Sequence, residues 1–286
     1  MTWRPACSHA ALEARAGVLR SIRDFFYGRE ILEVQTPCLG ARTVTEPAIE
    51  AVVVPGLGYL QTSPEYHLKR LLAAGAPSLY WLGPVFRAAE AGRLHNPEFT
   101  MLEWYRRDWS DTELMAEVAE LVDVVLGPAD YATRTYAEVV ARGGEGGADR
   151  DRAELDLAYA NGLETLGPGR VFVVDYPAEQ AALARLRPED PSVAARFELS
   201  IDGIEIANGY WELGDHGELQ QRFEADLAIR RAAGQPLPEI DQRFMAAMQS
   251  GLPDSAGVAV GVDRLLMLKL GASSLTEVMP FPLSLA

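Results

Sequence analysis

Hydrophobic residues first recur at helical spacing and later follow the shorter period of strands. Near the start, Ser8 is a good N-cap residue, and a helix is expected after it because side chains three or four positions apart share one face. The apolar positions that predict this helix are Leu12, Ala16, Leu19, Ile22 and Phe26. A short strand, "ILEVQTP", follows and should end at Pro37.

The rest of the chain alternates between the two kinds of pattern. Strands are expected at residues 78–86, 99–107, 170–177 and 257–262, with two short ones within 51–62. Helices are expected from Ser63-Pro64 to about 75, at 111–126, 216–234 and 241–250, and from near 263. Between two alternating runs lies Asp202-Gly203, a strong signal for a two-residue hairpin turn. Antiparallel strands flanked by helices predict an α+β fold.

Composition narrows the class of protein. The 286 residues are 48% hydrophobic and 23% charged, which is typical of a globular domain. The net charge of −15 argues against nonspecific binding to nucleic acid, because such a surface repels phosphates. Two cysteines, no apolar run of membrane-spanning length and a polar N-terminus favour a cytoplasmic protein.

The hairpin carries the clearest candidate site. With Asp202 and Gly203 in the turn, Ser200 faces Glu205, and Glu198 lies on the same face two residues away. Diagonal neighbours of this kind have Cα atoms roughly 7–8 Å apart, so two carboxylates there can converge on one divalent cation. The alternative is two solvated glutamates on an exposed face.

Asn208 and Glu212 would lie on the opposite face under strict alternation. Gly209 lies between them, and glycine inside a strand often marks a bulge. A bulge there would turn both side chains toward Glu205.

A second candidate site lies in "FRAAEAGRLHNPEFTMLEWY". Its second strand places Phe99, Met101, Glu103 and Tyr105 on one face, which suits a pocket for an aromatic ring and an ammonium group. Arg87 ends the preceding strand, where a guanidinium can hold phosphate oxygens. Arg93 and His95 lie in the loop between the strands and could close over a polyphosphate. The alternative is a polar hairpin with surface ion pairs, which usually contribute only ~0–1 kcal/mol.

The last strand feeds a helix that opens with Asp263-Arg264. Small residues alternate with valine on this strand, which leaves room for a ligand or another backbone segment to approach closely. Asp263 has an ordinary place near a helix N-terminus, whereas Arg264 gains nothing from the helix dipole. A bound anion or a stacked ring would explain Arg264 better.

Three segments together resemble the signature motifs of class II aminoacyl-tRNA synthetases. They are "REILEVQTPCL", "FRAAEAGRLHNPEFTMLEW" and "GVAVGVDRLLML". Within that class, "TSPEYHLKRLL", "HNPEFTMLEWY" and "GIEIANGYWEL" are similar to lysyl-tRNA synthetases. The resemblance implies an antiparallel sheet flanked by helices.

Only about ten residues precede the first expected helix, so the anticodon-binding domain of a lysyl-tRNA synthetase is expected to be absent. The chain then resembles the stand-alone elongation factor P–(R)-β-lysine ligase family. Ser63 and Ala259 support this choice, because lysyl-tRNA synthetases usually have Ala and Gly there. We expect a single catalytic domain over 1–286, with a flexible connection near 141–152.

The resemblance implies roles for individual residues. Those expected at ATP are Arg87, Glu90, His95, Asn96, Phe99, Glu205, Ile206, Gly261 and Arg264. Those expected at the amino acid are Ser63, Glu65, Glu103, Tyr105, Asn208 and Glu212. Glu198 and Glu205 would bind magnesium, and Arg87, Glu205 and Arg264 would be catalytic. The family pattern has Glu at position 89, where this chain has Ala89.

The implied reaction uses ATP and Mg²⁺ to activate (R)-β-lysine or lysine as an adenylate. The aminoacyl group then passes to a lysine of elongation factor P, and the enzyme is expected to be a homodimer. Two alternatives stay open: a minimal lysyl-tRNA synthetase, which the acidic charge disfavours, and a noncatalytic paralogue that binds amino acid or nucleotide.

Overall fold

The computed structural model describes residues 3–88, 90–144 and 152–286. Contacts divide the chain into two compact units. Unit 1 contains residues 1–108, 214–255 and 259–286, and unit 2 contains 109–213 and 256–258. A single catalytic domain stays a prediction. Ala89 and most of the flexible connection expected near 141–152 lie outside the described residues.

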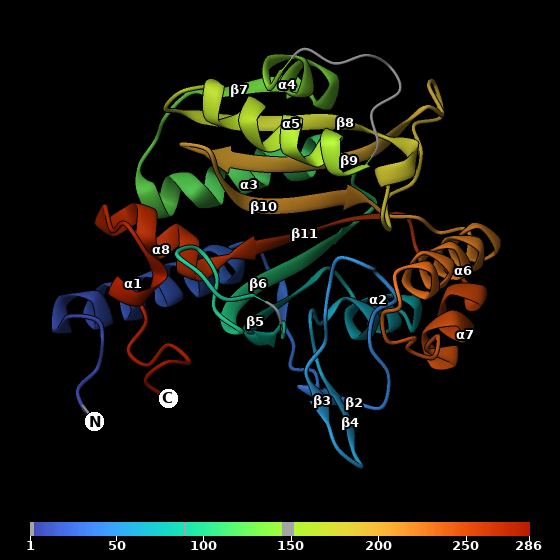
Figure 1. Cartoon of the computed structure of the whole chain (residues 1–286), viewed down its shortest axis with the longest axis horizontal. Coiled ribbons are helices and arrows are strands. Elements are labelled where there is room, and N and C mark those ends of the chain that lie inside the picture. The colour runs from blue at the N-terminus through green and yellow to red at the C-terminus, as the bar shows by residue number, and fades with distance from the viewer. Residues whose placement is uncertain (1–2, 89, 145–151) are drawn as a thin grey trace. The chain divides into compact units, whose positions relative to one another are not determined.

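Unit 1 is built on strands in the order β1-β5-β6-β11 (Figure 1). These are β1 (Leu32–Glu33), β5 (Leu79–Phe86), β6 (Glu98–Arg107) and β11 (Ser255–Gly261), the last of which gives its central residues to unit 2. β5 and β6 are antiparallel, and Trp81 pairs with Glu103. β1 instead runs parallel to β5, so the expectation of an antiparallel sheet is wrong at this edge. The parallel pairing of β1 was not predicted, because only two residues of the expected strand "ILEVQTP" form hydrogen-bonded pairs with β5.

Helices and a small sheet complete unit 1. The helices are α1 (His9–Tyr27), α2 (Glu65–Ala73), α6 (His216–Ala232), α7 (Gln242–Ser250) and α8 (Val262–Leu270). The sheet has the order β2-β4-β3, from β2 (Leu39–Gly40), β3 (Val53–Val54) and β4 (Gly58–Leu60). A 3₁₀ turn, η2 (Leu275–Glu277), follows α8. Apolar side chains of α2, β5 and β6 form one buried cluster, which includes Leu68, Leu72, Trp81, Met101 and Tyr105.

Helix α1 begins where it was predicted to begin. The Ser8 Oγ accepts a hydrogen bond from Ala11 N at 3.2 Å, so the expected cap is confirmed. The buried face differs in part from the predicted one, because Ala16 is exposed and Val18 is buried. A helical side chain is buried if it faces the core, even where its position does not fit the predicted series of apolar residues.

Arg230 of α6 fastens the loop that precedes β3. Its Nε donates to Thr45 O at 2.7 Å, and its NH2 donates to the carbonyls of Glu46 and Ile49 at 2.6 and 2.7 Å. The Thr45 hydroxyl in turn donates to Asp226 Oδ2 at 2.7 Å. Burial raises the pKa of the Asp226 carboxyl to about 6. This loop and α6 are therefore held together by polar contacts around one buried guanidinium.

Unit 2 contains strands in the order β10-β9-β8-β7. They are β7 (Tyr131–Thr135), β8 (Arg170–Pro177), β9 (Val193–Ile201) and β10 (Ile204–Trp211). The helices are α3 (Asp111–Leu126), α4 (Tyr136–Arg142) and α5 (Arg152–Thr165), with the 3₁₀ turn η1 (Ala178–Gln180). β7 and β8 are parallel, a second exception to the antiparallel expectation. β7, α4 and α5 were not predicted.

The predicted hairpin is confirmed in its register. Ile201 pairs with Ile204 and Ser200 with Glu205, while Asp202 and Gly203 have φ values of +52° and +76°. Both residues of a type I′ turn need positive φ, which explains the Asp-Gly pair. Asp202 Oδ1 also accepts from Gly169 N at 2.8 Å, so the turn is tied to the start of β8. Among the helices of the described ranges, none is long and apolar enough to cross a membrane.

Candidate functional site

A buried carboxylate lies at the centre of the predicted amino-acid pocket in unit 1. Glu103 of β6 is 3% exposed. Its Oε2 accepts from Ser63 Oγ at 2.7 Å, and its Oε1 accepts from Tyr105 OH at 2.8 Å. The same Ser63 oxygen accepts from Glu65 N at 3.0 Å, which fixes the start of α2. The structure therefore brings together four residues that were predicted to bind the amino acid.

The charge balance of this pocket is set by burial. Lys69 of α2 is 2% exposed and donates to Glu65 Oε1 at 2.6 Å. Burial, followed by the negative charge of Glu65, raises the pKa of Glu103 to about 8. Removing an ionised carboxylate from water is costly, so burial favours the protonated form of Glu103. A ligand ammonium group beside it would favour the ionised form.

Ala259 of β11 packs against the apolar cluster that contains Met101 and Tyr105. Phe99 packs against the same cluster. The β6 stripe predicted from alternation is thus confirmed as one face, with apolar residues on either side of Glu103. It is more completely buried than the sequence suggested.

Arg87 lies just beyond the end of β5. Its NH1 donates to Glu90 Oε1 at 3.2 Å, and its Nε donates to Thr62 O at 3.4 Å. The guanidinium carbon lies 5.2 Å from the centroid of the Phe99 ring. With side chains of Arg87 and Glu90 23% and 28% exposed, the pair is accessible to a ligand. An anion that approaches Arg87 would have to compete with Glu90 for it.

Arg264 of α8 is held against the loop that follows Arg87. Its Nε donates to Leu94 O at 3.2 Å, and its NH2 lies 2.7 Å from His95 Nε2. Burial and the neighbouring Arg264 charge lower the pKa of His95, so the imidazole is neutral at pH 7 and can accept from the guanidinium. Gly261 ends β11 next to the side chain of Arg264. A Cβ atom added to Gly261 would lie 3.8 Å from Arg264 Cδ.

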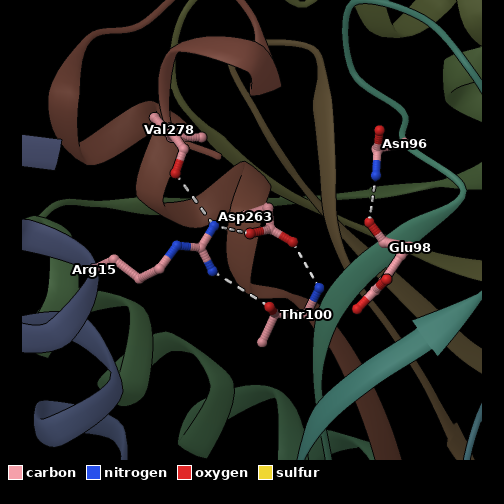
Figure 2. A network of polar contacts seen from close by, with 6 residues as sticks. All are labelled: Arg15, Asn96, Glu98, Thr100, Asp263 and Val278. Atoms are coloured by element: carbon pink, nitrogen blue, oxygen red, sulfur yellow. Dashed lines mark hydrogen bonds and ion pairs between the residues drawn. The ribbon is translucent and has the colours of Figure 1, made fainter. Parts of the chain in front are cut away.

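Asn96 is 9% exposed, and both polar atoms of its side-chain amide form hydrogen bonds with the backbone. Its Nδ2 donates to Glu98 O at 2.6 Å, as Figure 2 shows, and its Oδ1 accepts from Leu283 N at 3.0 Å. These bonds anchor the loop to β6 and to the C-terminal segment. A contact between Asn96 and ATP stays a prediction.

The second group of predicted residues lies on the hairpin of unit 2. Glu205 pairs with Ser200 and Asn208 pairs with Glu198, because the register shifts between Glu205 and Ala207. The extra residue of this bulge is Ile206. Since cross-strand partners share a face, Glu198, Glu205 and Asn208 all lie on the same face. Glu212, four residues beyond Asn208, follows the same alternation.

The bulge was expected at Gly209, and that position is wrong. Asn208, Gly209 and Tyr210 pair regularly with β9. Gly209 is needed for a different reason, because a Cβ there would lie 2.4 Å from the Phe197 ring and 3.0 Å from Val258 Cβ. The glycine therefore permits close packing of the sheet. The predicted result, that Asn208 lies on the same face as Glu205, is correct, but the bulge that causes it is at Ile206 and not at Gly209.

The two glutamates predicted to bind magnesium differ in their surroundings. Glu205 is exposed, whereas Glu198 is 8% exposed. Glu198 Oε2 accepts from Tyr159 OH at 3.0 Å, and Oε1 forms a short ion pair with Arg196. No group of three or more His, Cys, Asp or Glu in the described part of the chain could hold a metal ion.

The two glutamates fit a magnesium ion that is also bound by substrate phosphates and water. Mg²⁺ is commonly bound by one or two carboxylates together with substrate phosphates and water. Glu205 fits this role directly. Glu198 fits it less well, because Arg196 already neutralises its charge, although each carboxylate oxygen keeps a second lone pair.

Asn208 and Glu212 offer buried polar atoms to a ligand. Asn208 Oδ1 is buried and has no hydrogen-bond partner among the described residues. Glu212 is 1% exposed, and its backbone carbonyl accepts from Arg185 Nε at 3.0 Å. A buried amide oxygen without a partner is costly, so a ligand ammonium group would stabilise it.

Sequence reasoning missed some of the contacts that hold the predicted residues. Tyr159 of α5 contacts Glu198, but α5 was not predicted at all. Asp263 was given an ordinary place near a helix N-terminus. It instead contacts Thr100 and Arg15, far away in the sequence. Long-range partners of this kind leave no local pattern.

Comparison with known proteins agrees with the resemblance found in the motifs. The family model described as tRNA synthetases class II (D, K and N) matches residues 1–284. The elongation factor P–(R)-β-lysine ligase of Enterobacter sp. (strain 638) is 44% identical, over 98% of this chain and 97% of the relative. Those of Hamiltonella defensa subsp. Acyrthosiphon pisum (strain 5AT) and Edwardsiella ictaluri (strain 93-146) are 41% and 43% identical, with similar coverage. The chain belongs to the class II tRNA synthetase family and, within it, to the elongation factor P–(R)-β-lysine ligases.

Proposed function

We propose that this protein activates (R)-β-lysine, or lysine, with ATP and transfers it to a lysine side chain of elongation factor P. The names of the relatives support the reaction and the acceptor. The observation that carries the choice of substrate is the buried Ser63–Glu103–Tyr105 cluster beside Glu65, since a buried acidic pocket favours an amine. A cytoplasmic location and a homodimer are parts of the same proposal.

In this proposal the residues of unit 1 bind both reactants. Arg87 holds an oxygen of the α-phosphate, while Phe99 and Arg264 lie on either side of the adenine ring. Ser63, Glu65, Glu103 and Tyr105 orient the amino groups of the substrate. Their shared role is to place the substrate carboxylate in line with the α-phosphorus, and such positioning accounts for much of the catalysis.

For the hairpin residues of unit 2, we propose the roles that the family resemblance implies. Glu198 and Glu205 would hold the magnesium ion, which neutralises charge on the phosphates when bound. Ile206 would contact ATP through the backbone of the bulge. Asn208 would accept from a substrate ammonium group through its buried Oδ1, and Glu212 would also bind the amino acid.

The second half of the reaction needs little acid–base assistance. A lysine amine attacks the carbonyl carbon of the adenylate, an amide bond forms, and AMP leaves with the bonding electrons of the C–O bond. The amine must lose its proton, and the phosphate of the departing AMP or solvent can accept it. A net charge of −15 favours an acceptor with a basic surface around its lysine.

The deciding experiment is mass spectrometry of elongation factor P after incubation with the protein, ATP and (R)-β-lysine. We expect its mass to rise by that of one lysyl residue. Bulk tRNA is offered in a parallel reaction with radiolabelled lysine. Charging of tRNA with no change in elongation factor P would replace the proposal by a minimal synthetase, and absence of pyrophosphate exchange would favour a noncatalytic paralogue.

A further inference from the structure

Asp263 lies in the first turn of α8 and is 2% exposed. Carboxylates in this place commonly interact with the start of their own helix. Asp263 instead accepts a hydrogen bond from Thr100 N of β6 at 2.6 Å through Oδ2. Figure 2 shows the carboxylate between Thr100 and Arg15.

Arg15 of α1 provides the opposite charge. Its NH2 forms an ion pair with Asp263 Oδ1 and also donates to Val278 O at 3.3 Å. Its NH1 donates to Thr100 Oγ1 at 3.3 Å. The side chains of Arg15 and Asp263 are 17% and 3% exposed. One guanidinium thus joins α1, β6, α8 and the segment after η2 (Figure 2).

The two ends of the Thr100–Asp263 bond are each next to a residue of the proposed nucleotide site. Thr100 follows Phe99 on β6, and Asp263 precedes Arg264 on α8. The bond therefore ties the backbone that carries Phe99 to the helix that carries Arg264. A buried ion pair is weak evidence for stability, since apolar side chains of the same size often serve as well. A role in fixing geometry is the better reason for this pair.

We propose that Asp263, held by Arg15, is a positioning residue that sets the separation of Phe99 and Arg264 for the adenine ring. The inference rests on the proposed function, because it takes ATP as the ligand of these two residues. It extends that function to two residues outside the set predicted to bind ATP. Misplacement of a binding group by about 1 Å can lower activity about 100-fold, so a positioning role should be measurable.

The test compares binding of ATP with binding of lysine, each measured alone by calorimetry. Asp263→Ala removes the acceptor of the Thr100 N–H, and we expect at least a tenfold weaker ATP complex with lysine affinity within twofold of wild type. Asp263→Asn keeps an oxygen for Thr100 N, so its loss should be smaller. Arg15→Lys keeps the charge and should also lose less than Asp263→Ala. Thr100→Val keeps the backbone bond to Asp263 and removes only the 3.3 Å bond from Arg15 NH1 to Thr100 Oγ1, so it should lose much less ATP affinity than Asp263→Ala.

Steady-state exchange kinetics provide a second measurement, in which KM for ATP should rise while KM for lysine stays constant. Equal losses of ATP and lysine affinity, or unchanged ATP affinity in the folded Asp263 and Arg15 variants, would overturn the inference. If Asp263→Ala fails to fold, the graded losses expected of Asp263→Asn and Arg15→Lys decide the question. Failure of the wild type to bind ATP would instead refute the proposed function.

Discussion

Replacing Glu103 by Gln should remove most of the pH dependence of lysine binding. In the free protein, burial and the charge of Glu65 raise the pKa of Glu103 to about 8. Lys69 of α2, together with the hydroxyls of Ser63 and Tyr105, faces the same pair of carboxylates and lowers that pKa. An ammonium ligand is attracted by the ionised form, so affinity should rise with pH.

The size of the effect follows from the fraction ionised. A group with a pKa of about 8 is ionised to ~1% at pH 6 and to ~50% at pH 8. If only the ionised form binds the ammonium group, affinity should therefore increase roughly 50-fold over this interval. At pH 7, binding should release close to one proton, because about 90% of the free carboxyl groups carry one.

Calorimetry at pH 6, 7 and 8, in two buffers of different ionisation enthalpy, measures both affinity and proton release. Glu103→Gln should bind more weakly at pH 8 and show a nearly flat profile. Titration of the substrate's own amino groups is common to both proteins and cancels in their ratio. Ser63→Ala should shift the wild-type profile to higher pH, because the Ser63 hydrogen bond lowers the Glu103 pKa. A wild-type affinity that changes less than twofold, without proton release, would refute the reasoning.

Three further predictions concern stability and chemistry. Glu205→Gln should reduce pyrophosphate exchange at least about 100-fold while the unfolding midpoint stays within a few degrees; unchanged exchange would rule out a metal role. Gly209→Ala should destabilise by about 1–3 kcal/mol in urea unfolding, because its Cβ would lie 2.4 Å from the Phe197 ring. Gly17→Ala, which meets no neighbour within 4 Å, is the control and should not destabilise. Asp226 has a raised pKa of about 6, so its contribution to the stability of the folded state should fall as pH rises from 4 to 7. The Tm of Asp226→Asn should gain on wild type over that range, and a constant difference would contradict this.

Much of the fold could be predicted because its signals are local. The Asp202-Gly203 turn determines the hairpin register, and Ser8 determines the start of α1. Residues 111–126 match α3 in both bounds, helped by the capping box between Ser110 and Glu113. The β6 stripe followed from period 2 alone. In each case the residues that decide the structure lie within a few positions of one another.

The rest depends on partners far away in the sequence. β7 has only five residues and pairs with β8, which lies far along the chain, and the apolar residues of α5 do not gather on one helical face, so neither element has a clear local pattern. The bulge at Ile206 follows from pairing with β9 rather than from its own neighbours. Glu103 meets Ser63 across 40 positions, and Arg15 meets Asp263 across 248. The residue types indicated where the site lies. Which polar side chains have hydrogen-bond partners is seen only in the folded structure.

The C-terminal segment has a practical meaning for anyone who engineers this protein. Val278 O accepts from Arg15, Pro280 O accepts from Ala6 N, and Leu283 N donates to Asn96 in the loop after β5. Truncation from residue 278 onward would therefore remove one support of the loop after β5 and two contacts of the N-terminal region, although no predicted ligand-binding residue would be deleted. Affinity tags and fusion partners placed directly after residue 286 could strain the same supports. Loss of activity in such a tagged or fused protein should be checked with a flexible spacer before it is attributed to the catalytic residues.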